Sequence, residues 1–415
     1  MSDSIVSTRQ SCGAKAPFKS ARFTARSEKL SVAQRNTVWL MAFLYLQDIF
    51  WLSVSRISLS YYPPMYNVAR FEWPLFGLFV IIAVLFAAIA MAAAQMLRPL
   101  RKILVPRWVI PGIIVTAILL NFMKLALLAD NARYVSGALT GTAGVVNGVS
   151  SALVLASIVL FVRMQKLGSP LSKPLFITFM VSLVITIDGL AAALTLGMFM
   201  LLILDVRLRR PGRVIVLTVL GLGLLWVGFT AKISEIPIYM TPQFFIQWVI
   251  ARFSIQAEQM YTFLAGQSVI GNSISYLELI LRAISDRFDL VLGRPLTLEY
   301  PRSVSEATYY DMMGTYYSGS SPGALLGTAL QGPFFFIVVP FVFTFLFLQY
   351  FYGITRKVNL VHICAYSFVF KSVHANFSEY LTIISPNLLT VAIFALSCLL
   401  VPNTTAQSVL VKQGR

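Results

Sequence analysis

Charged residues are scarce in this chain. They make up 12% of its 415 residues, against roughly 25% in an ordinary soluble domain, whereas hydrophobic residues make up 58%. Apolar runs of about 17 to 25 residues recur along almost the whole length, and each could cross the roughly 30 Å hydrocarbon core of a bilayer as a helix. The composition therefore predicts an all-α, polytopic membrane protein with a single integral domain.

Cysteine and histidine are also scarce. Of three cysteines, Cys364 and Cys398 lie in apolar runs and Cys12 lies in the polar N-terminal segment. This spacing predicts neither a disulfide framework nor a metal site. The two histidines, His362 and His374, lie at or near one predicted membrane helix, where a lone histidine is more often structural than catalytic.

The N-terminal segment lacks the features of a removable signal peptide. Residues 1–35 carry seven basic residues, without a compact hydrophobic core beside a small-residue cleavage site. We expect a mobile cytoplasmic tail here. The chain also lacks an evident internal repeat or low-complexity tract.

The apolar runs predict ten membrane helices, with each boundary placed to within several residues. They lie at about 37–55, 74–97, 108–129, 143–163, 175–188, 190–206, 213–231, 323–350, 359–373 and 385–402. The predicted helices 175–188 and 190–206 are joined by a single Asp188–Gly189 turn. A single helix there would invert everything downstream, but the arginine cluster at 207–213 favours two.

The net charge of +17 does not indicate nucleic-acid binding, because the basic residues cluster beside hydrophobic runs. Of the 33 basic residues, 22 fall on one alternate side of the predicted helices, against three acidic ones. That side is expected to be cytoplasmic. The division is then a tail (1–35), helices one to seven (36–231), an outer loop (232–322), helices eight to ten (323–402) and a second cytoplasmic tail (403–415).

The outer loop is the only long polar-rich segment between apolar runs, so any chemistry is expected there. Within it, Ile274–Val291 has one apolar face and one face on which Glu278, Arg282 and Asp286 follow at four-residue spacing. This pattern predicts an amphipathic helix that lies on the membrane surface or roofs the helix bundle. A second helix is expected at Gln243–Leu264.

Several arginines of the loop are candidate phosphate ligands. Guanidinium groups pair with phosphate oxygens in a bidentate manner and stay charged at any accessible pH. A lipid diphosphate would suit them, but ion pairs with acidic loop residues or contacts with lipid headgroups are the alternatives, favoured for Arg282 in particular. The candidates are Arg252, Arg282, Arg287, Arg294 and Arg302.

The stretch Pro301–Asp311 combines carboxylates with tyrosines just before a predicted membrane helix. A carboxylate can take the proton of an attacking sugar hydroxyl, and tyrosines can bind sugars. Glu306 and Asp311 are therefore candidate general bases, and Tyr309 and Tyr310 are candidate sugar-binding residues. For either carboxylate, a helix cap or an arginine partner is the structural alternative.

The run Ser320–Gly327 predicts a helix start, with Ser321 as the cap and Pro322 in the first turn. Free amide donors at such a start can hold a phosphate, although most starts are only caps. Ser320 and Gly323 are counted as candidate diphosphate ligands. Asp48 and Lys124 are charges inside predicted membrane helices, for which either a functional role or mutual pairing is expected.

These features resemble the O-antigen or oligosaccharide repeat-unit polymerases (Wzy-type) of bacterial envelopes. The matching features are the many-helix bundle, the late outer loop, Arg252-Phe253-Ser254 leading to Glu258, and the run Ser320–Gly327. The resemblance implies a metal-independent membrane glycosyltransferase of the GT-C type in the bacterial inner membrane, with no cofactor. It would transfer a growing glycan from undecaprenyl diphosphate onto a new lipid-linked unit, for O-antigen, capsule or exopolysaccharide.

By the same resemblance, Arg252 would hold the carrier diphosphate, and the run Ser320–Gly327 would shape the same pocket. Flippase and chain-length regulator proteins would be partners. The roles of Arg287, Arg302, Glu306 and Asp311 come from residue chemistry alone. The chain departs from the family at Asp188–Ala192, where many members carry an arginine.

Two other functions remain open. A transporter or flippase for lipid-linked sugars would use Asp48, Lys124 and glycine-rich helices near the bilayer midplane, and it would leave the charged loop without a task. An O-antigen ligase would share the layout but typically carries a loop histidine. No histidine occurs between 231 and 322, which favours the polymerase.

Overall fold

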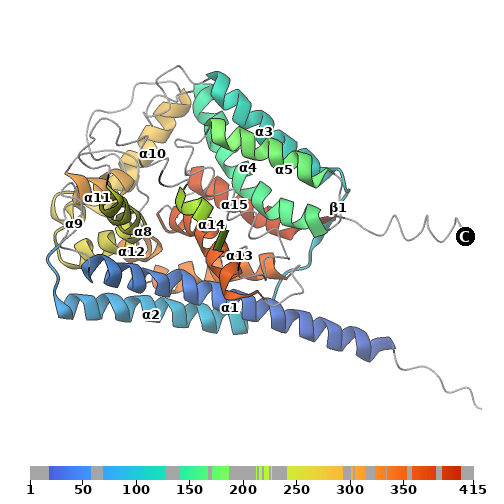
Figure 1. The fold of residues 1–415 in the computed structure, drawn as a ribbon, viewed down its shortest axis with the longest axis horizontal. Coiled ribbons are helices and arrows are strands. Elements are labelled where there is room, and N and C mark those ends of the chain that lie inside the picture. Colours follow the sequence, from blue (N-terminus) through green and yellow to red (C-terminus); the bar gives the residue numbers. More distant parts are fainter. Residues whose placement is uncertain are drawn as a thin grey trace, which may run out of the picture.

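The protein is largely helical, as the composition predicts. The computed structural model describes residues 18–57, 69–127, 141–166, 171–186, scattered positions between 212 and 226, 241–292, 301, 304–314, 323–332, 334–352, 358–379 and 386–402. Among these residues, the departure from an all-α structure is a small parallel pair of strands, in which β1 (Ile103–Val105) pairs with β2 (Leu400–Pro402). Figure 1 shows the helices packed around one another, with α1 extending beyond the rest.

The first two helices contain the longest apolar segments among the described residues. α1 (Phe18–Ile57) and α2 (Trp73–Met96) pack side by side, as Figure 1 shows. Within the described residues, Val32–Ile57 and Trp73–Met96 are the two segments long and apolar enough to cross a membrane. Residues 18–35 of the predicted tail are helical and continue α1, because the sequence from Phe18 to Ile57 contains no proline or glycine to end a helix.

The next three helices form a group. α3 (Val109–Leu127) packs against α4 (Gly141–Lys166) and α5 (Ser172–Thr186), at positions close to those predicted. The Asn121 side chain links all three, since its Oδ1 accepts from the Ser150 hydroxyl and its Nδ2 donates to Ser182 Oγ over 3.1 Å. Such buried polar contacts are typical of helices that pack in an apolar environment.

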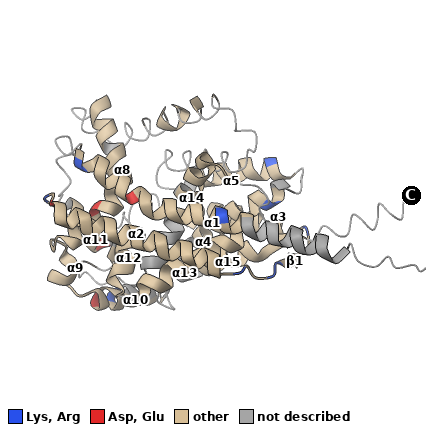
Figure 2. Ribbon diagram, turned by 90° about the horizontal axis from the view of Figure 1, so that it is seen from below, with Lys and Arg blue, Asp and Glu red and all other residues tan. Residues whose placement is uncertain are grey.

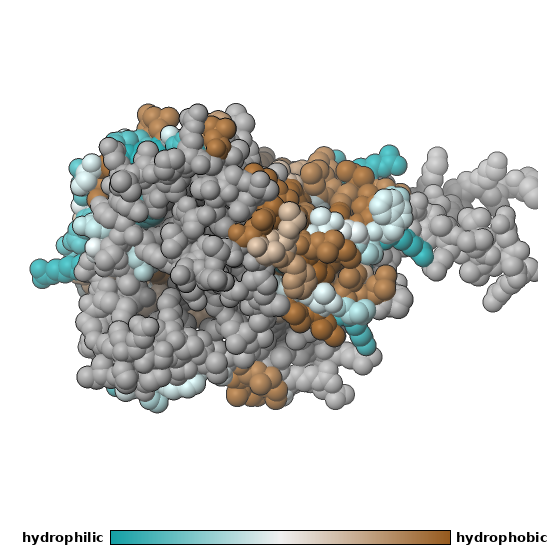
Figure 3. All heavy atoms as spheres, turned by 90° about the horizontal axis from the view of Figure 1, so that it is seen from above, coloured by the Kyte–Doolittle hydropathy of each residue, from teal (hydrophilic) through white to brown (hydrophobic). Residues whose placement is uncertain are grey.

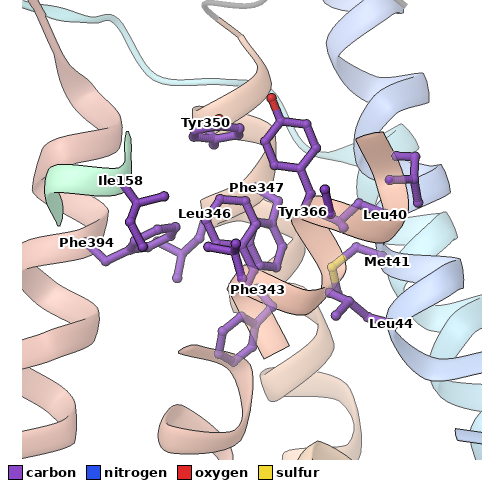
Figure 4. Close-up of a cluster of buried hydrophobic side chains, with 14 of the residues drawn as sticks. Leu40, Met41, Leu44, Ile158, Phe343, Leu346, Phe347, Tyr350, Tyr366 and Phe394 are labelled. Carbon is purple, nitrogen blue, oxygen red and sulfur yellow. The ribbon is translucent and has the colours of Figure 1, made fainter. Parts of the chain in front are cut away.

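Helices from the end of the chain complete the core. α13 (Phe335–Phe351), α14 (Leu360–Glu379) and α15 (Pro386–Leu399) pack with α1, α2 and α4. Figure 4 shows Phe343 and Phe347 of α13 beside Leu40 and Met41 of α1 and Phe394 of α15, all buried.

The single helix predicted at 323–350 is wrong, because this stretch forms two helices. α12 (Ala324–Leu330) ends before Gly332, which has a φ of 96°, and α13 begins at Phe335. A positive φ interrupts a right-handed helix, and Pro333 next in the sequence cannot donate a backbone hydrogen bond.

The predicted outer loop contains four described helices. They are α8 (Pro242–Leu264), α9 (Val269–Asn272), α10 (Tyr276–Leu292) and α11 (Val304–Met313). The helices predicted at 243–264 and 274–291 are confirmed. α8 begins where the Thr241 hydroxyl accepts a hydrogen bond from the Phe244 amide over 3.1 Å, with Pro242 in the first turn.

The apolar face of α10 points away from the described bundle. Leu277, Leu281 and Phe288 are 65%, 58% and 51% exposed, whereas Leu279 on another side is buried beside Ile274 and Val304. This face therefore does not roof the described part of the bundle. A position on the membrane surface stays the prediction for it.

Cationic side chains tie together helix ends on the side of the molecule opposite to α9 and α11. Lys102 Nζ donates to the backbone carbonyls of Gln349 and Cys398, and Arg163 Nη2 donates to the same Cys398 carbonyl over 3.0 Å. The C-terminal ends of α4, α13 and α15 thus meet beside the 97–102 segment that follows α2. Cations suit this place, because the terminal carbonyls of helices lack backbone partners.

Candidate functional site

A buried ion pair joins the end of α1 to the middle of α8. Arg56 Nη2 donates to Glu258 Oε2, and the two side chains are 6% and 0% exposed. The Ser55 hydroxyl donates to Glu258 Oε1 over 2.5 Å, so both carboxylate oxygens of Glu258 have a donor. The pair links residues about 200 positions apart in the sequence, which makes it a strong constraint on how α1 and α8 pack.

The Arg56 guanidinium has two further contacts. Its Nη1 donates to the Ala69 carbonyl over 2.6 Å, and its Cζ lies 4.3 Å from the centroid of the Tyr261 ring. A buried cation gains from an aromatic face as well as from a carboxylate. Arg56 therefore holds together α1, α8 and the segment that leads into α2.

Tyr261 fixes that segment from its other side. Its hydroxyl oxygen accepts a hydrogen bond from the Glu72 amide over 2.7 Å, and its ring stacks on Phe71 with centroids 6.4 Å apart. Residues 69–72 are consequently held against α8 at the start of α2.

Burial changes the acidity of Glu258. Removal from water raises its pKa from the ordinary 4.5 to about 7, although Arg56 and the Ser55 hydroxyl act in the opposite direction. This carboxyl therefore titrates near neutral pH.

A pocket of about 370 Å³ lies next to this ion pair. Ala69, whose carbonyl Arg56 holds, forms part of its wall, and Thr262 follows Tyr261 along α8. The volume is within the range of small-molecule sites, roughly 300–1,000 Å³. The lining residues are Ala69, Thr262, Gln267, Ser268, Val269, Asn272, Ser273, Tyr310, Asp311 and Gly314.

The loop between α8 and α10 builds one wall of the pocket. Gly266 and Gly271 have φ values of 67° and 90°, which allow the chain to reverse twice within a few residues. The Ser268 hydroxyl caps the short α9, accepting from the Ile270 amide over 3.1 Å. The wall is thus ordered by its own backbone hydrogen bonds.

Asp311 joins this wall to α11. Its Oδ2 accepts from the Ser268 hydroxyl over 2.5 Å and its Oδ1 accepts from the Val269 amide over 2.8 Å. Burial raises the pKa of Asp311, while these two hydrogen bonds act to lower it. Asp311 therefore caps α9, which is the structural role expected as an alternative to catalysis. It is also a carboxylate in the wall of a pocket.

Of the predicted site residues, the structure brings Tyr310 and Asp311 into the pocket wall. Glu306 lies one turn earlier on α11, 4% exposed, and it does not line this pocket; Tyr309 is half-buried and does not line it either. The two candidate bases therefore occupy different surroundings.

Gly323 lies directly against α8. A Cβ atom at this position would come within 2.8 Å of the Cβ of Gln256. The start of α12 and the middle of α8 are therefore in contact, which brings the glycine-containing run near the segment that carries Arg252. The backbones of Arg252 and Arg287 belong to α8 and α10, whereas their side chains, and all of Arg302 and Ser320, lie outside the described residues.

Arg282 has the partner that its spacing predicts. Its Nη2 donates to Glu278 Oε1 over 2.6 Å, across one turn of α10, so the ion-pair interpretation is confirmed. Arg56, Tyr261 and Ser268 were not predicted as site residues from the sequence. A signal for Arg56 existed: it is a basic residue at the end of an apolar run on the side where the positive-inside rule expects few.

Within the described ranges, no three His, Cys, Asp or Glu side chains lie close enough together to hold a metal ion. Figure 2 shows most of the described acidic residues at the end of the molecule with α9, α10 and α11. Comparisons of the chain with models of protein families, with characterised proteins and with solved structures find no match.

Proposed function

We propose that this protein is a polytopic membrane glycosyltransferase that polymerises lipid-linked oligosaccharide repeat units at the outer face of a bacterial inner membrane. The observation that carries the proposal is the pocket in which Asp311 and Tyr310 line one wall and α8 the other. A carboxylate, a tyrosine and several hydroxyl and amide groups in one concave site suit a sugar substrate.

Exposed apolar side chains support the membrane setting. Leu119 and Met123 of α3 and Ile177 of α5 are 61%, 46% and 63% exposed. Figure 3 shows a broad hydrophobic area on this side of the molecule. An apolar surface of this kind is costly in water and is expected where helices face lipid.

The positions of helix ends support the proposed topology. The segments after α2 and α4 and the ends of α13 and α15 belong to the side predicted to be cytoplasmic, and they meet around Lys102 and Arg163. The end of α1, the start of α2 and helices α8, α9 and α11 meet around Arg56 and the pocket, on the side predicted to be outside.

The chemistry would be a single displacement. The acceptor hydroxyl oxygen forms a bond to the anomeric carbon of the growing glycan, while the bond from that carbon to the carrier diphosphate breaks and the diphosphate leaves with the electron pair. Asp311 would take the hydroxyl proton. Its raised pKa makes it a better proton acceptor than an exposed aspartate, provided that it is ionised.

The diphosphate would bind beside the pocket, on the part of α8 that carries Arg252 and faces the start of α12. Gly323 allows the start of α12 to lie close to α8, since it contacts Gln256, one turn after Arg252. Arg287 and Arg302 are the further cations proposed for the same anion.

The test is a gel profile of surface polysaccharide from cells that lack this chain, complemented with wild type, Arg252→Ala or Arg282→Ala. We expect single-repeat glycans without a ladder for the deletion and for Arg252→Ala. Arg282→Ala is the matched control, because Arg282 pairs with Glu278 across one turn of α10 and does not line the pocket, and it should restore the ladder.

A ladder that persists in the deletion strain would refute the polymerase function for that glycan. Loss of the single-unit band as well, reproduced by Lys124→Ala, would indicate export instead. Arg252→Lys should also fail, because an ammonium cannot form the bidentate contact of a guanidinium.

A further inference from the structure

We infer that the pocket between α8, α9 and α11 binds an uncharged, hydroxyl-bearing sugar and excludes anionic ones. Under the proposed function this sugar would be the terminal residue of the acceptor, an assignment that rests on that function. The binding itself follows from the groups in the pocket wall and can be measured without any transfer reaction.

The first of these groups is the side-chain amide of Asn272. Its Nδ2 donates to the backbone carbonyls of Gly266 and Ser268, over 2.7 and 2.8 Å. Both N–H groups are therefore used within the loop, which fixes the orientation of the amide. What Asn272 can offer to a ligand is its Oδ1, a hydrogen-bond acceptor.

The second group is the hydroxyl of Thr262. Thr262 lies in the pocket wall on α8 and is 3% exposed, and within the described part of the chain its Oγ1 has no hydrogen-bond partner. A buried hydroxyl without a partner costs stability, so its presence needs an explanation. A ligand hydroxyl in the pocket would supply the missing partner.

The third group is the carboxylate of Asp311. Ser268 and Val269 each donate one hydrogen bond to it, on different oxygens, and each oxygen keeps a further acceptor position. Asp311 is the one charged residue among the described residues that line the pocket. Its negative charge favours a ligand that donates hydrogen bonds and repels a carboxylate or phosphate.

Together these groups present acceptors on two sides of a pocket of about 370 Å³, with the half-buried Tyr310 beside them. A sugar ring supplies several hydroxyl donors and an apolar face that can pack on an aromatic ring. Free phosphate and acidic sugars lack this match, because they bring negative charge to Asp311.

The experiment measures ligand binding to the purified full-length protein in detergent by saturation-transfer NMR. The probes are the methyl glycosides of glucose, galactose and mannose, with methyl glucuronide as the anionic counterpart of the glucoside. We expect saturable binding of at least one neutral glycoside and none of the glucuronide.

The decisive variant is Thr262→Val, which keeps the shape and removes the hydroxyl. It should weaken binding of the neutral glycoside about five- to tenfold, the effect of one hydrogen bond. It should also raise the thermal midpoint, because it removes an unpartnered buried group. The matched control is Thr116→Val on α3, whose exposed side chain donates to its own helix at Gly112, and which should leave binding unchanged.

Three outcomes would overturn the inference: no binding of any neutral glycoside, equal binding of the glucuronide, or binding that Thr262→Val leaves unchanged. The polysaccharide profile distinguishes this failure from failure of the proposed function. If neutral sugars bind but the deletion strain keeps its ladder, the sugar site stands and the polymerase does not. If no sugar binds but the deletion abolishes the ladder, the reverse holds.

Discussion

Arg56 at the end of α1 and Glu258 in α8 form an ion pair that is almost completely removed from solvent, with side chains 6% and 0% exposed. The pair also holds the Ala69 carbonyl, and Ala69 lines the pocket. A contact between two charges so far apart in the sequence connects α1 to the candidate site. Its removal should therefore affect both stability and function.

Arg56→Ala should destabilise the protein severely. It would leave the Glu258 carboxylate buried without its cation, a change that typically costs about 3–5 kcal/mol. Arg56→Lys keeps the charge but loses the hydrogen bond to the Ala69 carbonyl, so we expect an intermediate loss of stability. Thermal unfolding in detergent, followed by circular dichroism, would measure both.

The control for Arg56 is Arg282→Ala, which removes the more exposed pair with Glu278 and should cost about 0–1 kcal/mol. Equal effects of Arg56→Ala and Arg282→Ala would contradict the importance given to the buried pair.

The titration of Glu258 should make stability depend on pH. Its pKa in the folded protein is about 7, above the ordinary 4.5, so the folded state binds the proton more tightly than the unfolded state. The stabilisation linked to this group is fully present below pH 4.5 and is lost as the pH rises through about 7.

The measurement is the thermal midpoint of wild type and of Glu258→Gln across this pH range. Asp311, whose pKa is also raised, contributes with the same sign, so the difference between the two proteins isolates Glu258. A difference that does not change with pH would rule out the titration of Glu258.

Asp311→Asn should separate the two candidate bases. If Asp311 takes the acceptor proton, the Asp311→Asn variant should form about 10²- to 10⁴-fold less polymer. The Glu306→Gln variant should form polymer normally, because Glu306 lies outside the pocket. Polymer formed by membranes with lipid-linked units would be quantified at matched protein levels. Loss with Glu306→Gln but not with Asp311→Asn would move the base to Glu306.

Gly323→Ala should disrupt the contact between α12 and α8. The new Cβ would meet the Cβ of Gln256 at 2.8 Å, and overpacking of this kind typically costs about 1–3 kcal/mol. Gly77→Ala in α2 is the control: nothing lies within 4 Å of its added Cβ, and alanine favours a helix by about 0.5–1 kcal/mol.

A second change tests the cause. Since the clash is with a Cβ atom, Gln256→Gly should rescue Gly323→Ala in part, whereas Gln256→Ala should not. Unfolding midpoints and ladder length of wild type, Gly323→Ala and the two double variants would measure the coupling between the two positions. Equal midpoints for the Gly323→Ala and Gly77→Ala proteins would mean that α12 moves freely from α8.

Local sequence patterns were sufficient for most helices. Proline at the start of α8, apolar runs in α2 and α13, and four-residue spacing in α10 each act within a few residues, so they can be recognised without a partner. The same holds for the Glu278–Arg282 pair. Two local features were overlooked: the break at Gly332 and the uninterrupted helix that starts at Phe18.

The identity of the site residues needed more than local pattern. Composition and periodicity alone determined the helical class, the amphipathic helix and the polar segment in which Tyr310 and Asp311 were found. Only the tertiary structure decided that Asp311 rather than Glu306 lines the pocket, that Ser268 and Val269 hold it, and that Arg56 neutralises Glu258. The physical reason is that burial and ion pairing depend on which helices pack together, and a single sequence does not specify contacts between residues 200 positions apart.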